Sequence, residues 1–309
     1  MNKENNFWGY VLAASSIFLW GITFVCTKAL LNDFSAFEIL FFRFLAAYAG
    51  LWAIRPKRLV LKNKKENWLF FLAGLSGITI YQQAENIAIN FTTASNVSII
   101  VSICPIFTAI IAQIFLKEKH LNFRFVLGFL IALSGIALVS FNGHTEFHLS
   151  PKGDLLALLA AVSWGFYSLF VSKVNLLGYD DILCTRRFFF FAILSMLPFL
   201  AAGLFGKNPD SSFYVNAAKE INAARFSKPM NWVNLLFLGW GASAFCFAAW
   251  GYACNKLGTV KTTVGLYLIP VVTIIFAFAF LGENITLMGL AGTALTIGGL
   301  FISSSGRKK

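Results

Sequence analysis

The stretch Pro105-Ile-Phe-Thr-Ala-Ile-Ile-Ala-Gln-Ile-Phe-Leu-Lys-Glu118 occurs a second time in the chain. With the same spacing from proline to glutamate, it returns as Pro270-Val-Val-Thr-Ile-Ile-Phe-Ala-Phe-Ala-Phe-Leu-Gly-Glu283. Each copy is typical of an apolar helix that contains a proline and ends at a carboxylate. A repeat of this length predicts two copies of one structural unit, so each helix of one half should have a counterpart in the other.

Other residues upstream of these stretches repeat as well, with a shift of 144 positions. The pairs are Gly9 with Gly153, Trp20-Gly21 with Trp164-Gly165, and Arg43 with Arg187. Because the proline stretch is shifted by 165 positions, the second half must hold 21 extra residues after its arginine. They fit the polar stretch at about 206–231, which has no counterpart in the first half.

The composition is that of a membrane protein. Hydrophobic residues make up 58% of the chain and charged residues 12%, against about half and about a quarter in soluble proteins. A membrane-spanning helix needs about 20 mostly apolar residues, and such runs fill the sequence. We therefore predict an all-α membrane protein with ten transmembrane helices, arranged as two inverted five-helix repeats. The first repeat covers 7–141, an outer linker 142–152, and the second repeat 153–303 with an outer insertion at about 206–231.

The ten predicted spans are separated by short polar segments. They lie at about 9–31, 35–54, 68–89, 94–116, 125–141, 153–174, 181–204, 232–255, 264–281 and 285–303. The fifth span carries Gly128, Ala132 and Gly135, a small-residue face that permits close contact between helices. Within the insertion, Phe213–Arg225 could form a surface helix.

The net charge of +12 comes from basic residues in the loops between spans and indicates topology, not nucleic-acid binding. The loop from Arg55 to Lys65 holds six basic residues in eleven, and the chain ends in Arg-Lys-Lys. Cytoplasmic loops are enriched in such residues, so both termini should be cytoplasmic. Since each repeat has five spans, the two halves would have opposite orientations. That arrangement places a ligand site near mid-bilayer between the halves and suits alternating access; the alternative is a repeat that only packs a membrane scaffold.

On these residues the chain resembles the EamA-type branch of the drug/metabolite transporter superfamily. The shared features are a Trp-Gly helix opening each half, an arginine in the next helix, and two Pro-x12-Glu units, and the resemblance covers essentially the whole chain. It implies a ten-helix bacterial inner-membrane transporter, often an exporter of amino acids or related metabolites. It also implies a central cavity lined by the first, third, fourth, sixth, eighth and ninth helices. The insertion departs from the compact family pattern.

Trp20 and Trp164 each lie about eleven residues into their helices, which places both near mid-bilayer. Tryptophan prefers the membrane interface, so two symmetry-related copies at this depth require an explanation. They either form a stacking surface for a substrate or pack beside the small glycines that follow them. Further aromatic residues could complete an aromatic cavity or be plain packing: Tyr167, Trp250, Tyr252 and Tyr267.

Glu85 is the acidic residue that lies well inside a predicted span. A bare carboxylate in hydrocarbon costs several kcal/mol, so Glu85 must be protonated, paired, or turned toward a wet cavity. Three roles compete: proton coupling, binding of a substrate ammonium group, and a buried structural pair with Arg43 or Lys28.

The residues around this glutamate form a polar face on one helix. Gln82, Glu85, Asn86 and Ile89 share that face by their three- and four-residue spacing, and Tyr81 is four residues from Glu85. A polar face on a membrane helix normally turns toward the protein interior. We therefore expect these side chains to line the substrate cavity.

Arg43 and Arg187 are also near mid-depth, where a guanidinium could hold a substrate carboxylate. The second and seventh helices are less central to the cavity in the resembled family, which favours a structural role for both arginines. Pro105 and Pro270 should bend equivalent helices and could serve as hinges. The glutamates that close the two proline stretches are expected to be interfacial anchors or gates.

The sequence gives little support to other classes of function. His144, Glu146 and His148 have metal-ligand spacing but no third fixed ligand, so a solvated loop is expected there and no metal site. The five cysteines lie in apolar runs without a CxxC pair, which predicts neither a disulfide framework nor a zinc site. A P-loop and a catalytic constellation are both missing from the sequence, so we expect no enzyme, no ATP-driven pump and no cofactor.

The sequence thus predicts a secondary transporter in the bacterial inner membrane that moves a small polar metabolite, such as an amino acid, by alternating access, and exports it. A proton-coupled carrier for an organic cation, using Glu85 and an aromatic cage, is the first alternative. A membrane-embedded enzyme and a structural subunit are the alternatives from other classes. The expected partners are the lipid bilayer, a small-molecule substrate and protons as a candidate coupling ion, with the chain a monomer or a weak homodimer.

Overall fold

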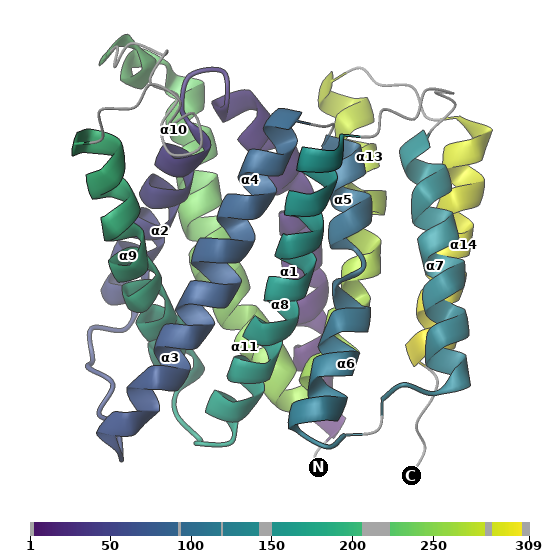
Figure 1. Cartoon of the computed structure of the whole chain (residues 1–309), viewed down its shortest axis with the longest axis horizontal. Helices are drawn as coiled ribbons and strands as arrows, with labels where there is room; N and C mark the ends of the chain where they lie inside the picture. Colours follow the sequence, from purple (N-terminus) through teal and green to yellow (C-terminus); the bar gives the residue numbers. More distant parts are fainter. Residues whose placement is uncertain are drawn as a thin grey trace.

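A computed structural model describes residues 3–91, 94–118, 120–141, 150–205, 223–281 and 286–304. Throughout these ranges the regular structure is helical, and the helices run side by side along one direction (Figure 1). The first helix begins and the last one ends on the same side of the molecule. The loop at 144–148, which is expected to be solvated, most of the possible surface helix at 213–225, and Glu283 lie outside the described residues.

The first half of the chain forms α1 (Lys3–Leu30), α2 (Ala36–Ile54), the 3-10 turn η1 (Lys64–Glu66), α3 (Asn67–Gly74), a π-helical segment η2 (Leu75–Ile80), α4 (Tyr81–Phe91), α5 (Ala94–Val101), α6 (Cys104–Phe115) and α7 (Phe123–Phe141). The turn between the first two helices ends in a capping box. The Ser35 hydroxyl accepts a hydrogen bond from the Glu38 amide, and the Glu38 carboxylate accepts one from the Ser35 amide. These two bonds satisfy donors that the start of a helix leaves open.

The second half forms α8 (Pro151–Asn175), α9 (Asp181–Phe205), the 3-10 turn η4 (Ala223–Ser227), α10 (Pro229–Leu236), a π-helical segment η5 (Phe237–Phe245), α11 (Cys246–Leu257), α12 (Thr259–Val264), the 3-10 turn η6 (Gly265–Leu268), α13 (Ile269–Leu281) and α14 (Leu287–Ser304). The two π-helical segments lie in the third helical stretch of each half. Such segments widen the backbone and are frequent at functional sites.

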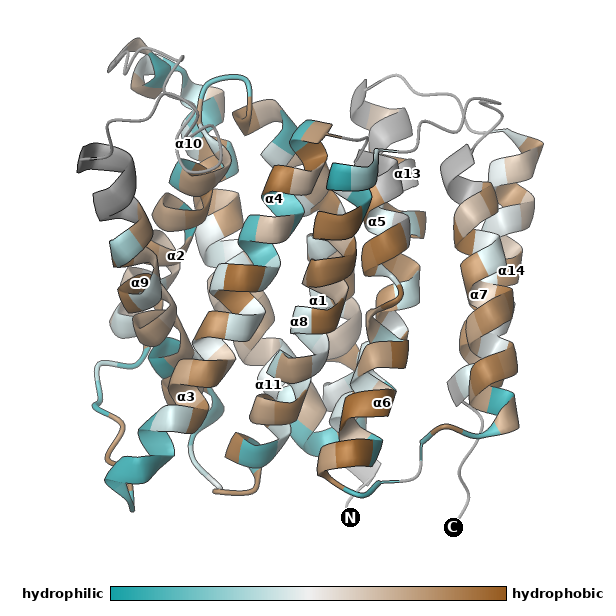
Figure 2. Ribbon diagram, viewed as in Figure 1, coloured by the Kyte–Doolittle hydropathy of each residue, from teal (hydrophilic) through white to brown (hydrophobic). Residues whose placement is uncertain are grey.

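The helices are apolar along their lengths and polar at their ends (Figure 2). Five of them are long and apolar enough by themselves to cross a membrane: Asn6–Leu30, Ala36–Ile54, Pro151–Asn175, Asp181–Phe199 and Pro229–Leu257. Shorter apolar helices account for much of the remaining described chain, at Cys104–Phe115, Phe123–Leu138, Thr259–Thr273 and Leu287–Ser303. The chain is therefore a multi-pass helical membrane protein.

The two proline-containing helices are interrupted rather than smoothly bent. Residues 102 and 103 form a turn between α5 and α6, and Pro105 lies in the first turn of α6. In the second half, the 3-10 turn η6 separates α12 from α13, whose second residue is Pro270. Proline has no N–H for the carbonyl four residues earlier, so each α-helix ends and a new one begins at the same place in both halves.

The two halves interlock through the glycines that follow the repeated tryptophans. A Cβ atom on Gly21 of α1 would lie 2.5 Å from Val272 Cγ1 on α13, and one on Gly165 of α8 would lie 2.8 Å from Ile111 Cδ1 on α6. Each half therefore places its Trp-Gly helix against the interrupted helix of the other half. Glycine is needed at both positions because a methyl group would push these helices apart.

The predicted small-residue face of α7 packs against α14, and the pair stands at one edge of the molecule in Figure 1. A Cβ atom on Gly128 would lie 2.4 Å from the Ser303 nitrogen, and one on Gly135 would lie 2.5 Å from the Thr296 nitrogen. On the α14 side of the contact, a Cβ atom on Gly299 would lie 2.4 Å from the Ala132 nitrogen. This confirms the expected close helix contact.

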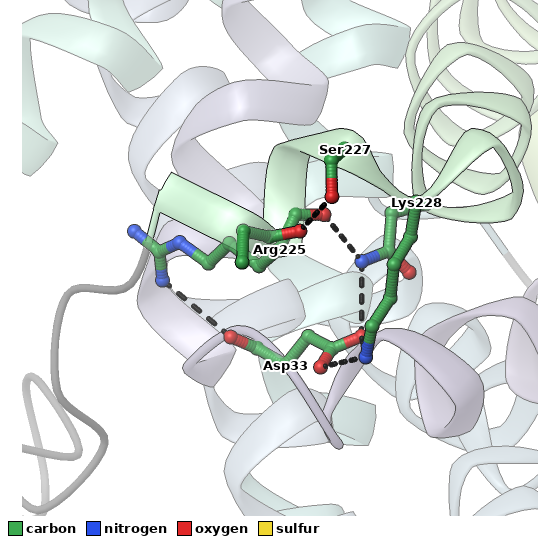
Figure 3. A network of polar contacts seen from close by, with 6 residues as sticks. Asp33, Arg225, Ser227 and Lys228 are labelled. Carbon is green, nitrogen blue, oxygen red and sulfur yellow. Dashed lines mark hydrogen bonds and ion pairs between the residues drawn. The ribbon is translucent and has the colours of Figure 1, made fainter.

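Polar clamps tie the halves together at both ends of the bundle. At the end opposite the termini, Arg225 of η4 forms a bidentate pair with Glu38, with N–O distances of 2.8 and 3.1 Å. Beside this pair, the Lys228 ammonium and the Asn231 amide both donate to the Asp33 carboxylate, and an Arg225 guanidinium N–H donates to the Asp33 carbonyl (Figure 3). The described end of the insertion is thus fastened to the turn between α1 and α2.

A second clamp lies at the end where the termini are. The Tyr179 hydroxyl donates to Glu66 Oε2 at 2.6 Å and accepts from the Lys62 amide at 2.7 Å. Desolvation and the hydrogen bond to Glu66 raise the pKa of Tyr179, so its hydroxyl keeps the proton that it donates. Asp180 pairs with Arg55 at 3.2 Å. The turn between α8 and α9 is therefore held against the basic loop before α3, as the turn between α1 and α2 is held against α10.

Candidate functional site

A small cavity lies where the two interrupted helices meet the tryptophan helices. Its volume is about 30 Å³, room for about two water molecules. It is lined by Trp20, Thr23, Phe24, Arg43, Tyr81, Gln82, Glu85, Ser98, Val101, Ser102, Trp164, Leu266 and Ile269. Both halves of the chain contribute to this central cavity, which fits the expectation of a ligand site between the repeats.

The interrupted helices reach the cavity at equivalent points. Val101 and Leu266 both line it, and they are the residues whose carbonyls lie four positions before Pro105 and Pro270. Neither carbonyl can enter an α-helical hydrogen bond with the proline four residues later. The proline repeat therefore places non-α backbone from both halves beside the same cavity, a situation that membrane proteins tolerate next to buried or wet sites.

An aromatic cluster forms the floor of the cavity. The Trp20 ring lies edge-on to the Trp164 ring, with centroids 5.6 Å apart and an interplanar angle of 90°. Trp250 lies 4.9 Å from Trp20, while Tyr81 and Tyr167 each lie 5.0 Å from Trp164. Aromatic pairs at these separations stabilise one another beyond their buried area. The two repeated tryptophans thus both pack together and present ring surface to the cavity.

Arg43 brings a positive charge to the opposite wall. Its side chain is 2% exposed, its Nη1 donates to Gln82 Oε1 at 2.7 Å and its Nε donates to Ser243 Oγ at 2.8 Å. Both partners are neutral and come from the two widened helical stretches, α3–η2–α4 and η5–α11. The guanidinium is therefore fixed in place by hydrogen bonds that leave its charge without a direct carboxylate partner among the described residues.

Glu85 lines the same cavity and is 7% exposed. Its carboxylate lies near the Tyr81 hydroxyl, one helical turn earlier, and within electrostatic range of Arg43. No Arg43–Glu85 ion pair within 4 Å forms in the described part of the chain. A cation and a carboxylate that face one cavity without closing on each other can take the two charged ends of a zwitterion.

The two repeated tryptophans differ in their hydrogen bonding. The Trp20 indole N–H donates to the Ala242 carbonyl in η5 at 2.8 Å. The Trp164 indole N–H is buried and has no hydrogen-bond partner among the described residues, although Trp164 is only 2% exposed. A buried unpaired donor is costly. Because Trp164 lines the cavity, an acceptor atom of a ligand bound there is a candidate partner for this donor.

The predicted site residues fall into three groups. Trp20, Tyr81, Gln82, Glu85 and Trp164 line the central cavity. Tyr167 and Trp250 lie directly behind the two repeated tryptophans as a second layer. The remaining three lie elsewhere: Asn86 donates to the Ala36 carbonyl at 3.3 Å, Tyr252 packs with Lys256, and Tyr267 packs with Phe129.

Sequence reasoning favoured a structural role for Arg43 over binding of a substrate carboxylate, whereas Arg43 lines the cavity wall. Its repeat counterpart Arg187 does have the expected structural environment, with Nε donating to Asn67 Oδ1 at 3.0 Å. The small polar residues Thr23, Ser98 and Ser102 were also missed. Ser98 lies on α5 and Ser102 in the turn that follows it, and their four-residue spacing just before Pro105 was a signal of a shared face that the sequence could have shown.

A larger cavity opens at the end of the molecule where the termini lie. It has a volume of about 680 Å³, within the range of small-molecule pockets. Its polar residues include Thr108 and Ser168 at its inner end and Asn175, Asn255 and Lys261 toward the loops. None of the cavity residues predicted from the sequence lines this vestibule. The buried charged residues Arg43 and Glu85 line the central cavity, and neither lines the vestibule.

These features define a class of protein: a multi-pass helical membrane protein with an interrupted helix in each half and a charged cavity between them, as in carriers of small molecules. The model of the EamA-like transporter family matches the chain twice, over residues 7–141 and 151–305. The chain belongs to this family and is a transporter.

Similar proteins cover nearly the whole chain. An "uncharacterized transporter" of Archaeoglobus fulgidus is 29% identical and aligns over 96% of this chain and 97% of its own length. A "probable terminal-alkyne amino-acid exporter" of Streptantibioticus cattleyicolor is 26% identical over 98% and 94% of the two chains. A "probable amino-acid metabolite efflux pump" of Salmonella typhimurium is 25% identical over 99% and 96%. A crystal structure with 18% identity shares the fold, with a TM-score of 0.74 over 98% of this chain and 97% of the other.

Proposed function

We propose that this transporter exports a small amino acid or a closely related zwitterionic metabolite across the bacterial inner membrane by alternating access. The observation that carries the proposal is the presence of Arg43 and Glu85 in one buried cavity without an ion pair between them. A carboxylate would bind the Arg43 guanidinium and the free Trp164 indole N–H, and an ammonium group would bind Glu85. The names of two relatives, one an amino-acid exporter and one an amino-acid metabolite efflux pump, support this substrate class.

The proposed architecture is ten transmembrane spans in two inverted repeats, with both termini in the cytoplasm. The shorter helices α5 with α6, and α12 with α13, each complete one span through an interruption next to Pro105 or Pro270. The two matches to the family model and the equivalent positions of the interruptions support this arrangement. In it, the 680 Å³ vestibule opens toward the cytoplasm and lets substrate approach the central cavity.

The central cavity is too small for an amino acid as it stands. Its volume of about 30 Å³ holds about two waters, so binding requires side chains to move. We propose that Gln82 releases Arg43 when a substrate carboxylate arrives, because a charged acceptor forms a stronger hydrogen bond with a guanidinium than a neutral amide does. The interruptions near the prolines provide the backbone freedom for the accompanying helix movement.

A thermal-unfolding screen of purified protein tests the substrate class. A ligand that binds only the folded state at 100 times its Kd stabilises that state by about 2.7 kcal/mol. The ligands are amino acids, their decarboxylated amines, and their N-acetyl derivatives, which lack the ammonium group. Amino acids should raise the unfolding temperature of the wild type, while both derivative sets should have little effect.

Arg187→Gln is the matched control for Arg43→Gln. Both variants remove an arginine from a proposed membrane span at equivalent positions of the repeat, but only Arg43 lines the cavity. Amino acids should still stabilise Arg187→Gln but not Arg43→Gln. Stabilisation of Arg43→Gln to the wild-type extent would refute the carboxylate site.

The organic-cation carrier stays the second candidate, because Glu85 lies beside the aromatic rings of Tyr81 and Trp164, which can hold a cation. In that case amines should stabilise the protein at least as well as amino acids. Glu85 would also couple transport to protons, and Glu85→Gln should remove any dependence of liposome uptake on an imposed pH gradient. A normal pH response in that variant would exclude the coupling role.

A further inference from the structure

A groove on the outside of the bundle combines two exposed lysines with three aromatic rings, of which Trp68 is exposed. It has a volume of about 400 Å³ and is lined by Lys64, Lys65, Asn67, Trp68, Phe71 and Phe191. The lysines come from the 3-10 turn η1, the next three residues from the first turns of α3, and Phe191 from α9. The groove shares no lining residue with the central cavity.

The two lysines are available to a ligand. Both are exposed, and within the described chain no carboxylate lies within 4 Å of either ammonium group. The adjacent acid, Glu66, accepts a hydrogen bond from Tyr179, while Asp180 pairs with Arg55. The nearby negative charges are therefore engaged in the clamp, and the groove keeps a surplus of positive charge.

Apart from the lysines and Asn67, the groove is lined by aromatic rings. Trp68 is 67% exposed. The Phe71 ring lies edge-on to both Trp68, at 5.6 Å, and Phe191, at 6.0 Å. Figure 2 shows that the start of α3 is hydrophilic and that the helix becomes apolar beyond it. A molecule that fills the groove must therefore carry a negative charge at the lysine end and an apolar part that packs against the aromatic rings.

The lysines are not required by the repeated fold. In the second half, the equivalent helix α10 begins with the uncharged residues Pro229 and Met230, and a single lysine, Lys228, precedes them. The lysine pair is therefore not a repeated feature of the fold.

We propose that this groove binds an anionic phospholipid, with its phosphate at Lys64 and Lys65 and its upper acyl chain along Phe71 and Phe191. Charge complementarity and the aromatic wall, which consists of half-buried Phe71 and Phe191 with exposed Trp68, both favour this occupant. Tryptophan prefers the level of the lipid headgroups, which fits Trp68 at the mouth of the groove. Each lysine or arginine near the membrane surface increases the affinity for anionic lipids by about fivefold.

Native mass spectrometry of the purified full-length chain tests the site, with dioleoyl phosphatidylglycerol titrated against dioleoyl phosphatidylcholine. The wild type should retain one phosphatidylglycerol in preference to phosphatidylcholine. The double variant Lys64→Gln/Lys65→Gln should lose about 30-fold in affinity for it. Both lysines are exposed, so the variant should fold, and an unchanged unfolding temperature without lipid checks this.

The double variant Lys57→Gln/Arg58→Gln is the control, since it removes the same charge from the same loop outside the groove. It should retain the lipid within about twofold of the wild type. Equal losses in both double variants would overturn the groove as the site and leave only a general attraction to the loop. Equal retention of the two lipids by the wild type, or protection from unfolding by inorganic phosphate alone to the same extent, would overturn the anionic phospholipid as the occupant.

Discussion

Replacing Gly77 by alanine should disturb the central cavity from behind. A Cβ atom at Gly77, in the π-helical segment η2, would lie 2.2 Å from Tyr167 Cδ2 and 2.3 Å from Cγ. Ordinary contact begins near 3.4 Å, so the ring must withdraw by about 1.2 Å. Tyr167 is 1% exposed and enclosed by Phe188 and Phe247, with centroids at 6.2 and 5.9 Å. The ring cannot retreat into solvent and must displace its neighbours.

The expected cost follows from this overpacking. Extra methyl groups in a well-packed core cost about 1–3 kcal/mol, and each kcal/mol lowers the unfolding temperature of a chain of this size by about 2 °C. Gly77→Ala should therefore unfold about 2–6 °C below the wild type in detergent. Since Tyr167 lies 5.0 Å from Trp164, the variant should also bind substrate more weakly and show altered tryptophan fluorescence.

Gly298→Ala is the matched control, because it makes the same change in the interior of α14, where an added Cβ meets nothing within 4 Å. Alanine is the better helix former by about 1 kcal/mol, so this variant should be at least as stable as the wild type. The losses from Gly77→Ala and Tyr167→Ala should be less than additive, since the smaller residue leaves room for the methyl group. A Gly77→Ala protein with wild-type stability and fluorescence would refute the close packing on which these values rest.

The other predictions concern topology, hinges and the buried charges. A single cysteine introduced at Lys62 in a chain without native cysteines should not react with an impermeant thiol reagent in intact cells, because the basic loop is expected in the cytoplasm; rapid labelling would reverse the proposed orientation. Alanine at Pro105 and Pro270 together should leave the protein in the membrane but slow transport, because the helices become more continuous; full transport in this double variant would remove the hinge role. Arg43→Met should destabilise the fold by about 1–3 kcal/mol for each buried polar partner that it leaves unsatisfied, and it also removes the cation nearest to the Glu85 carboxylate. Adding Glu85→Gln should recover at least about 1 kcal/mol of this loss in denaturant titrations, whereas an additive or greater loss would show that the two charges do not interact.

Several features could be predicted from the sequence because they depend on local chemistry or on the repeat. Apolar runs identify the helices, and Ser35 followed three residues later by Glu38 identifies a helix start. The glycines and alanine of α7 indicated a close helix contact, which occurs with α14. The repeated tryptophans pointed to the centre of the molecule, where they lie 5.6 Å apart.

The sequence also placed one polar face on one helix, but the tertiary structure divided that face. Tyr81, Gln82 and Glu85 line the cavity, whereas Asn86 turns toward the carbonyl at the start of α2. Helical periodicity gives the angle between side chains around an axis, but not the rotation of the helix against its neighbours. That rotation is set by contacts with residues far away in the sequence, such as the approach of Gly77 to Tyr167.

The same limit explains the arginines. Arg43 and Arg187 occupy equivalent positions in the repeat, and nothing in their immediate sequences distinguishes a cavity residue from a structural one. The difference arises from their partners: Arg43 meets Gln82 and Ser243 beside the cavity, and Arg187 meets Asn67 at the start of α3. The sequence by itself determined the helices and the repeat, because these follow from hydrophobicity and spacing. Only the tertiary structure decided which buried charges share a cavity, because that depends on how the two halves pack against each other.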